Sequence, residues 1–519
     1  MATKDYVLAV DQSTSGTKAL VIDRRGAVVA RASLEHRQIY PRAGWVEHDP
    51  LEIYENVKKA ARLALEAAGI GPGSLAALTV TNQRETAVLW DRSTGLPVYN
   101  AIVWQCQRTA GFCEKLREQG FEGEVRERTG LLLDPYFSAS KWRWMLDHAE
   151  GARRKLEERG LLAGTIDSWL VWKLTGGRVH ATDYTNASRT SLFDIHALKW
   201  DSGLCERFGV PESLLPSVLS SDAVYGVTED PDLFGDARVP ISGVIGDSQA
   251  ALFGNLCLEP GAAKATYGTG TSVLMNVGDR PAPAGEGLVQ AIAWGLGGKA
   301  AYALEAIIRT SGDTIKWVRD NLGLFADMGE LERLLAEAPH NEGVYLVPAF
   351  VGLGAPYWRP DARAALVGMN RGTGRAHIVR AAIESIAYQV RDAVELLEAE
   401  SGIALKELRA DGGATDNAVL MQFQADLLGR TVDKSEAAEL SALGSAYLGG
   451  LGTGFWPSLD GLVRETGRKY RSYAPVMALE ERENHYSGWK RAVASVIGPS
   501  IREPRADGSQ EEPVQAQTL

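Results

Sequence analysis

A turn rich in small polar residues occurs twice in this chain, once near its start and once just past its middle. The first turn, at residues 11–18, follows an apolar run at residues 6–10, and the second, at residues 267–272, follows a strand-like run at residues 261–266. Solenoid repeats recur every roughly 20–50 residues, so a recurrence over this distance predicts two similar α/β domains instead. The length of 519 residues agrees with this, because single hydrophobic cores stop growing at about 250–300 residues.

The chain is expected to divide close to Gly254, where a helix-like segment ends. This places one α/β domain at residues 1–253 and a second at residues 254–498. Residues 499–519 are polar and rich in Pro, Glu and Gln, and we expect them to be disordered because they offer little apolar surface to bury.

Capping signals and apolar patterns predict the main elements. Asp49 and Pro50 begin a helix that Gly69 ends, since Asp is a favoured N-cap, Pro a favoured first residue and Gly a favoured stop. The other predicted elements are strands at residues 75–81 and 87–90 and helices at residues 377–400 and 416–428.

The balance of charge and of apolar residues disfavours several classes of partner. The net charge of −11 argues against binding to nucleic acid or to an anionic membrane. No apolar run approaches the ~18 residues that a membrane span needs. The four cysteines include no CxxC pair, which argues against a zinc site or a disulfide framework, and the N-terminus lacks a long apolar leader. These features predict a cytoplasmic protein.

The first polar turn has the composition of a phosphate site. Asp11 stands at the end of a predicted strand, where its carboxylate can hold hydrated Mg²⁺. The hydroxyls of Ser13, Thr14 and Ser15 and the ammonium group of Lys18 can contact phosphate oxygens. Taken alone, such a turn is equally typical of an ordinary hairpin.

Two further glycine-containing turns favour the phosphate interpretation. One contains Gly268 and Thr269, and the other is the Asp-Gly-Gly-Ala segment at residues 411–414. None of these turns has the GxxxxGK[ST] pattern of a P-loop, and the chain lacks GxGxxG at these places, which argues against a Rossmann-type dinucleotide fold.

Three such elements in this order resemble the superfamily of actin-like and Hsp70-like ATPases. The resemblance implies an α/β fold of two actin-like (ribonuclease H-like) domains with an ATP cleft between them. Residues 136–148 resemble the first signature of the FGGY carbohydrate kinases, and residues 364–369 with 377–384 resemble the second. Further runs resemble the branch of that family that phosphorylates glycerol; they lie at residues 38–41, 44–50, 81–85, 99–105, 183–189, 348–358 and 420–423.

The likeness implies a kinase that uses ATP and Mg²⁺ to phosphorylate a small polyol, in a homodimer or homotetramer. Asp247 matches the catalytic base that accepts the proton of the attacking hydroxyl, and Asp11 matches the metal ligand. The positions that match the polyol site are Arg84, Glu85, Trp104, Tyr136, Asp247, Ser248 and Ser272. Those that match the nucleotide site are Ser13, Thr14, Ser15, Lys18, Gly268, Thr269, Gly312, Lys316, Gly413, Ala414 and Asn417.

Each of these residues also has an ordinary structural interpretation. Adjacent Arg84 and Glu85 are typical of a surface ion pair, Trp104 and Tyr136 of core packing, and Asp247 of a helix N-cap. A filament-forming or chaperone-type ATPase of the same superfamily is therefore the rival prediction, since it would need the phosphate turns but no pocket for a second substrate.

Four positions depart from the glycerol-phosphorylating branch. Lys18 and Lys316 replace a usual Arg and Gln, and Ser248 and Ser272 replace a usual Gln and Phe. The last two changes remove large side chains from the implied polyol pocket, so a four- or five-carbon polyol or ketose stays open beside glycerol as the acceptor.

Overall fold

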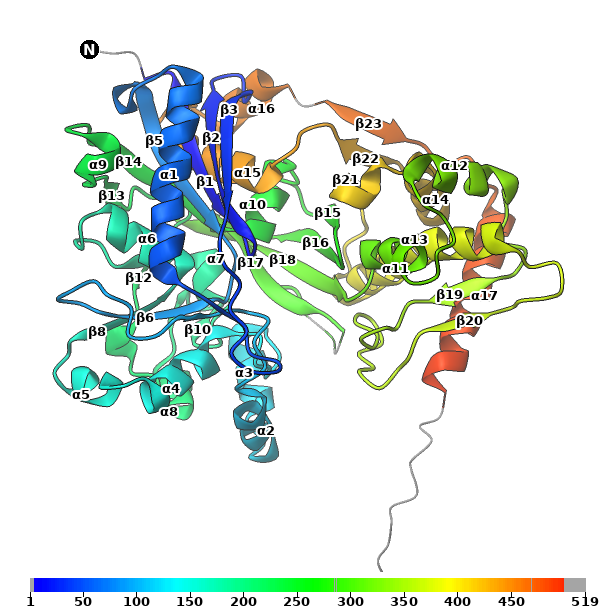
Figure 1. Cartoon of the computed structure of the whole chain (residues 1–519), viewed down its shortest axis with the longest axis horizontal. Coiled ribbons are helices and arrows are strands. Elements are labelled where there is room, and N and C mark those ends of the chain that lie inside the picture. The colour runs from blue at the N-terminus through cyan, green and yellow to red at the C-terminus, as the bar shows by residue number, and fades with distance from the viewer. Residues whose placement is uncertain (1–3, 284, 286, 468, 499–519) are drawn as a thin grey trace, which may run out of the picture.

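The computed structural model describes residues 4–283, 285, 287–467 and 469–498. Two lobes, each built on a mixed sheet covered by helices, lie side by side in Figure 1. We call them the first lobe, on the six-stranded sheet, and the second lobe, on the seven-stranded sheet. The predicted α/β architecture of two domains is confirmed. The predicted disorder of residues 499–519 concerns a segment outside the described residues.

The first sheet has the strand order β13–β14–β5–β1–β2–β3. The bounds of its strands are β1 Tyr6–Gln12, β2 Gly16–Asp23, β3 Val28–Glu35, β5 Leu75–Asn82, β13 Gly226–Val227 and β14 Pro240–Gly246. β1 and β14 both pair with β5 in parallel, on its two sides. The residues that follow these three strands therefore meet at one edge of the sheet, the edge at which open α/β sheets bind ligands.

The second sheet has the order β17–β18–β16–β15–β21–β22–β23. Its bounds are β15 Ala262–Tyr267, β16 Thr271–Gly278, β17 Val289–Leu296, β18 Lys299–Ile308, β21 Glu407–Asp411, β22 Val432–Ser435 and β23 Tyr470–Tyr473. Its core repeats that of the first: β15 and β16 form an antiparallel hairpin, as β1 and β2 do, and β15 pairs in parallel with β21, as β1 does with β5. The repeated turn of the sequence thus corresponds to a repeated hairpin.

Two helices lie between the lobes. They are α10 Asp247–Gly254 and α15 Leu440–Gly452. Although α15 comes late in the chain, it packs on β1, β5 and β14, and Figure 1 shows it in orange beside the blue strands. One hydrophobic cluster contains Val7 of the first sheet, Leu274 of the second sheet and Ala446 of α15. The two lobes therefore share buried apolar surface through these helices.

Glycines allow α15 to approach its neighbours closely. A Cβ atom on Gly444 would lie 1.8 Å from the carbonyl oxygen of Ala250 in α10. A Cβ atom on Gly449 would lie 2.8 Å from the carbonyl oxygen of Ser242 in β14. Side chains at these positions would overlap the backbone, so the close approach of α15 to α10 and β14 depends on their absence.

Local signals predicted the helices well. α1 spans Pro50–Ala68, with the Asp49 carboxylate accepting from the backbone N–H of Leu51 and with Gly69 in the left-handed conformation at its end. The predicted strands at residues 75–81 and 87–90 correspond to β5 and to β6 Ala87–Asp91, and the helix predicted at 377–400 corresponds to α13 Arg375–Ser401. α14 spans Ala418–Leu428 and starts two residues later than predicted, because Asn417 caps it after a 3-10 turn at Gly413–Asp416.

The remaining elements complete the two lobes. A four-stranded sheet in the first lobe contains β4 Glu47–His48, β6, β7 Ala101–Ile102 and β8 Leu161–Thr165. Short strands are β9 Ala181–Asp183, β10 Phe193–Asp194, β11 Lys199–Trp200, β12 Ser217–Leu219, β19 Tyr345–Val347 and β20 Ala365–Val367. The other helices are α2 Ala110–Glu118, α3 Glu122–Thr129, α4 Ser138–His148, α5 Ala152–Glu157, α6 Ile166–Leu174, α7 Tyr184–Ala187, α8 Ser202–Phe208, α9 Pro231–Phe234, α11 Gly312–Asp320, α12 Met328–Glu337, α16 Leu459–Thr466 and α17 Leu479–Ile497.

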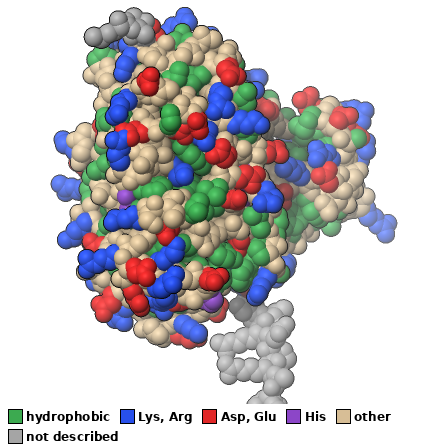
Figure 2. All heavy atoms as spheres, turned by 60° about the vertical axis from the view of Figure 1, so that its left-hand side comes forward, with side chains coloured by type: hydrophobic (Ala, Val, Ile, Leu, Met, Phe, Trp, Pro, Cys, Tyr) green, Lys and Arg blue, Asp and Glu red, His purple; other side chains and the backbone are tan. Residues whose placement is uncertain are grey.

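Two surface properties bear on partners. None of the helices in the described part of the chain combines the length and the apolarity that crossing a bilayer requires. On the face shown in Figure 2, basic and acidic side chains are interspersed over the first lobe. A mixed surface of this kind gives no strong field of one sign.

Candidate active site

The carboxyl ends of β1, β5 and β14 bring three predicted site residues to one edge of the first sheet. Asp11 lies near the end of β1, Arg84 follows β5, and Asp247 follows β14 and begins α10. Arg84 Nε lies 3.3 Å from Asp247 Oδ1. Burial and the negative charge of Asp247 raise the pKa of Asp11 to about 7, although Lys18 acts in the opposite direction. A cation near Asp11 would favour its charged form.

Arg84 belongs to a network of buried charges that extends into the second lobe. Its Nη2 atom lies 3.2 Å from Oε1 of Glu305, a residue of β18. Arg189 lies on the other side of Glu305, with Nη1 2.9 Å from Glu305 Oε2 and Nε 2.6 Å from Glu85 Oε1. Two guanidinium groups are thus held by two carboxylates. Glu305 fixes the orientation of Arg84, and Arg189 fixes that of Glu85.

The two carboxylates of this network differ in their environment. Burial alone would raise the pKa of Glu305, but the charges of Arg84 and Arg189 lower it to about 2. Burial raises the pKa of Glu85 in spite of the same two guanidinium groups. Glu85 also adopts a positive φ of 63°, which is uncommon for a residue with a side chain and is concentrated at functional sites. Glu305 is therefore the ionised counterion of the two guanidinium groups, whereas burial makes the charged form of Glu85 less favourable.

Two buried donors in this region lack partners. Arg189 Nη2 and Gln249 Nε2 make no hydrogen bond to any described residue. Gln249 lies in α10, and its Oε1 accepts from Arg84 Nη1 at 3.3 Å. Because an unsatisfied buried donor costs about 1–3 kcal/mol, such atoms are normally paired with a ligand or with water.

Trp104 and Tyr136 form an aromatic pair in the first lobe. Their ring centroids are 5.3 Å apart and their planes are inclined by 56°. The Trp104 indole N–H donates to Thr14 Oγ1 at 2.9 Å, so the pair is tied to the first polar turn. Both rings are half-buried, and burial raises the pKa of the Tyr136 phenol. The structure thus places these two predicted residues together beside the first turn.

Ser248 and Ser272 approach the charged network from different elements. Ser248 follows Asp247 in α10, and its backbone N–H donates to Asp247 Oδ1 at 2.6 Å. Ser272 lies in β16, and its hydroxyl donates to Glu305 Oε1 at 3.0 Å. Ser272 is therefore a partner of the buried carboxylate that holds Arg84.

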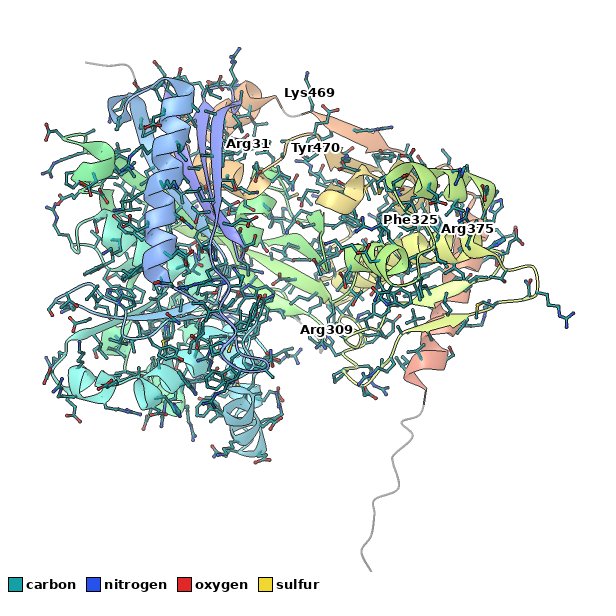
Figure 3. All side chains as sticks on the ribbon, in the orientation of Figure 1. Arg31, Arg309, Phe325, Arg375, Lys469 and Tyr470 are labelled. Atoms are coloured by element: carbon teal, nitrogen blue, oxygen red, sulfur yellow. The ribbon has the colours of Figure 1, made fainter. Side chains whose placement is uncertain are left out.

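Lys18 is paired in this structure. It lies opposite Asp11 in the β1–β2 hairpin, and its Nζ atom is 2.5 Å from Oε2 of Glu439, just before α15. Arg31, labelled in Figure 3, lies 3.7 Å from the other oxygen of Glu439. The turn between β1 and β2 is closed by the Ser13 backbone N–H, which donates to Gly16 O at 2.8 Å. Ser15, in the same turn, is exposed.

The second turn and the start of α11 come together in the second lobe. The N–H of Gly312 donates to Gly268 O at 2.9 Å, and that of Ser311 donates to Thr269 O at 2.8 Å. A Cβ atom on Gly312 would lie 3.7 Å from Ala414 Cβ. Gly268, Thr269, Gly312 and Ala414 are therefore neighbours.

The other predicted nucleotide residues border this surface. Gly413 directly precedes Ala414, and a Cβ atom added to it would meet no neighbour within 4 Å. The Asn417 side chain accepts from Leu420 N at the start of α14, so its Oδ1 atom is engaged as a cap. Lys316 is exposed on α11. Arg309, labelled near the middle of Figure 3, follows β18 and donates to Val351 O at 3.2 Å.

Sequence reasoning did not single out three residues of this site. Arg189 was part of a matched run but was assigned no role, and Glu305 and Lys264 were overlooked. Both were detectable, since each is a charged residue with an apolar residue on either side in its strand. Lys264 is buried, burial lowers its pKa, and its Nζ atom donates to Thr266 Oγ1 at 2.9 Å.

Comparison with known proteins agrees with this geometry. Residues 6–254 match the N-terminal domain of the FGGY family of carbohydrate kinases, and residues 263–453 match its C-terminal domain. Glycerol kinase 2 of Thermotoga maritima is 51% identical over 493 residues, 95% of this chain and 99% of that protein. Glycerol kinase of Symbiobacterium thermophilum is 52% identical over 495 residues, with 95% and 99% covered.

Solved structures lead to the same group. Plasmodium falciparum glycerol kinase with ADP has a TM-score of 0.90 and 35% identity, over 96% of this chain and 99% of that one. A ligand-bound xylulose kinase from Lactobacillus acidophilus has a TM-score of 0.85 at 20% identity, over 95% and 99% of the two chains, which supports the fold alone. With both domains matched and half of its residues shared with curated members, this chain belongs to the FGGY family of carbohydrate kinases.

Proposed function

We propose that this protein transfers the terminal phosphoryl group of ATP to glycerol, giving sn-glycerol 3-phosphate and ADP. The observation that carries the proposal is the identity of 51–52% to glycerol kinases over almost the whole of both chains. The charged group of Arg84, Glu85 and Asp247 supports it, because guanidinium donors and carboxylate acceptors together match the hydroxyls of a polyol.

Asp247 is proposed as the general base. Its carboxylate is 34% exposed and therefore accessible to a substrate, while the ion pair with Arg84 fixes its position. It would accept the proton of the attacking hydroxyl as that oxygen bonds to the terminal phosphorus and the bond from phosphorus to the ADP oxygen breaks. Arg84 and Glu85 would orient the other hydroxyls, and Trp104 and Tyr136 would cover the carbon chain.

Asp11 is proposed to hold Mg²⁺. A carboxylate is the oxygen ligand that Mg²⁺ prefers, and the pKa of Asp11, raised to about 7, is what a nearby cation would lower. When bound, Mg²⁺ supplies charge neutralisation on the phosphates. The first turn, with Ser13, Thr14 and Ser15, would donate to the phosphates, and Lys18 would exchange Glu439 for a phosphate oxygen.

The second-lobe surface is proposed to bind the rest of the nucleotide, across an ATP cleft from the first turn. Gly268 and Thr269 are exposed and would face the phosphates, and Gly312, Lys316, Gly413, Ala414 and Asn417 would surround adenosine. The domain division at residues 1–253 and 254–498 stays part of this proposal, with α15 as a late segment that packs on the first lobe.

A comparison of acceptors tests the proposed function. Initial rates with glycerol, erythritol, threitol, xylitol and dihydroxyacetone should give a kcat/KM for glycerol at least tenfold above the next, about 1.4 kcal/mol of transition-state stabilisation. A four- or five-carbon acceptor in first place would contradict glycerol and support the pocket enlarged by Ser248 and Ser272. Steady ATP hydrolysis that no acceptor accelerates would instead favour the rival ATPase.

Two further expectations belong to the proposal. The four cysteines are buried and free, which suits a reducing compartment such as the cytoplasm. A homodimer or homotetramer stays a prediction, and light scattering during size-exclusion chromatography would decide between them and a monomer.

A further inference from the structure

Three side chains that can bind a metal ion meet on the second lobe, away from the proposed active site. His340 lies in the loop that follows α12, and Glu481 and His485 lie in the last long helix, α17. Glu481 and His485 are one helical turn apart, so they occupy the same face of α17. One ligand atom from each of the three side chains lies within 4.8 Å of the other two. In Figure 1 both helices belong to the right-hand lobe, opposite β1 and β5.

The ring of His485 is held in place by residues behind it. Its side chain is only 14% exposed, and its Nδ1 atom lies 3.3 Å from the hydroxyl of Tyr388 in α13. Tyr388 is fully buried and stacks on Trp489, with ring centroids 5.2 Å apart and planes 8° apart. The orientation of His485 is therefore fixed by a rigid aromatic pair.

The two ring nitrogens of His485 face different neighbours. Nδ1 lies 3.3 Å from the hydroxyl of Tyr388, whereas Nε2 lies 3.9 Å from Glu481 Oε1. Nε2 is therefore the ring atom directed at the other two side chains, and the second nitrogen is engaged by the protein. Metal-binding histidines usually have their second ring nitrogen held in this way.

The spacing suits a small transition-metal ion. Bonds of about 2.0–2.1 Å in a tetrahedral site leave neighbouring ligand atoms about 3.3 Å apart. His340 and Glu481 are exposed, and rotation of their side chains would close the remaining gap. Two imidazoles and one carboxylate are ligands that Zn²⁺ favours, whereas Mg²⁺ and Ca²⁺ prefer sites made of oxygen atoms.

We propose that His340, Glu481 and His485 form a site for Zn²⁺ or a similar divalent transition metal, with a fourth position open to solvent. A hollow of about 410 Å³, lined by Asn341, Tyr345, Asn484 and His485 among others, leaves room for water at that position. Because the site joins the loop after α12 to α17, the bound ion would fasten the last helix to the second lobe.

Metal titration of the untagged full-length protein tests this site. After treatment with a chelator and buffer exchange, Zn²⁺ binding is measured by calorimetry and Co²⁺ binding by visible absorption, both in millimolar Mg²⁺ to occupy oxygen-only sites. One equivalent should bind, with the intense visible absorption of tetrahedral Co²⁺, and Zn²⁺ should displace it. Zn²⁺ should also raise the unfolding temperature, since a ligand that binds only the folded state stabilises it.

Variants locate the ion. His340→Ala and Glu481→Gln change exposed side chains and should fold normally, yet each should lower Zn²⁺ affinity at least tenfold and remove the gain in unfolding temperature. His196→Ala, at an exposed histidine of the first lobe, is the matched control and should bind Zn²⁺ as the parent does. Kinase activity without Zn²⁺ should be unchanged in His340→Ala.

Two results would overturn the site. One is that the parent protein takes up no stoichiometric Zn²⁺ at micromolar concentration. The other is that His340→Ala and Glu481→Gln bind it as tightly as the parent does, which would place the ion elsewhere, for instance at Asp11.

Discussion

At the scale of single residues, the site depends on charges that support one another. Arg84 is oriented by Glu305 and Gln249, and Glu85 by Arg189, so neither residue of the adjacent pair is positioned by the other alone. The closest approach of Arg84 Nε to Glu85 Oε1 is 3.9 Å. Removing one partner of a buried ion pair leaves the other charge uncompensated. Substitutions of Arg189 or Glu305 should therefore affect the reaction.

Asp247→Asn should lower turnover of glycerol by about 10²–10⁴-fold, since the amide cannot accept the proton. The affinity for ADP with Mg²⁺ should change little, because the carboxylate acts on the acceptor. Stopped-time assays of product and calorimetry of ADP binding measure the two quantities. A variant with the turnover of the parent would exclude Asp247 as the base.

Arg189→Lys should lower kcat/KM for glycerol by about 10²-fold, because Lys cannot bridge Glu85 and Glu305 with a fork and small displacements at a site are costly. ADP affinity should stay within about twofold of the parent, and the loss should appear mainly in KM. Arg128→Lys, which makes the same change at a surface pair with Asp201, is the control. Equal kinetics for both variants would argue against a positioning role for Arg189.

At the scale of elements, α15 packs through direct backbone contact as well as through side chains. It reaches α10 and β14 through glycines, and one cluster of buried side chains runs from it into both sheets. Such contact tolerates no added volume, in contrast to helices whose glycines face solvent.

Gly444→Ala should destabilise the protein by on the order of 2 kcal/mol, because its Cβ would overlap the carbonyl oxygen of Ala250. Gly123→Ala is the matched control: it also lies in a helix, α3, and its Cβ would meet nothing within 4 Å. There the change should be neutral or stabilising by up to about 1 kcal/mol, as expected from helix propensity. Thermal unfolding of both variants beside the parent measures the difference, and a loss of stability no larger in Gly444→Ala than in Gly123→Ala would contradict the close contact.

At the scale of the whole molecule, the proposed acceptor site is completed by both lobes. Arg84 of the first lobe is held by Glu305 of the second, and Gln290 of β17 donates its backbone N–H to Gly130 O at 3.1 Å. The proposed nucleotide surface lies on the same second sheet as Glu305. Ligands that engage both lobes should therefore influence each other.

Glycerol should bind about 5–150-fold more tightly when ADP is present, the range typical of coupled sites, and ADP should gain by the same factor when glycerol is present. Calorimetric titration of each ligand with and without the other measures both factors. The equality of the two factors is the internal control of this test, because thermodynamic linkage requires it. Affinities that do not depend on the second ligand would show that the lobes act independently.

Local sequence determined a large part of this structure. The Asp49 cap and the Gly69 stop defined α1. Apolar runs separated by a polar turn defined the β1–β2 and β15–β16 hairpins. All of these features depend on residues that are close in the chain. The strand-end positions of Asp11, Arg84 and Asp247 also followed from the sequence. Parallel pairing of β1, β5 and β14 then brings strand ends together whatever the side chains are.

Only the tertiary structure decided which distant groups meet. Nothing near Glu305 in the sequence indicates that it will lie between Arg84 and Arg189, and nothing near Lys18 indicates Glu439 as its partner. Likewise, α15 reads as part of the second half of the chain, yet it packs on the first sheet. Pairing of buried charges is set by how sheets and helices stack, and that arrangement is a property of the whole hydrophobic core, which no local pattern encodes.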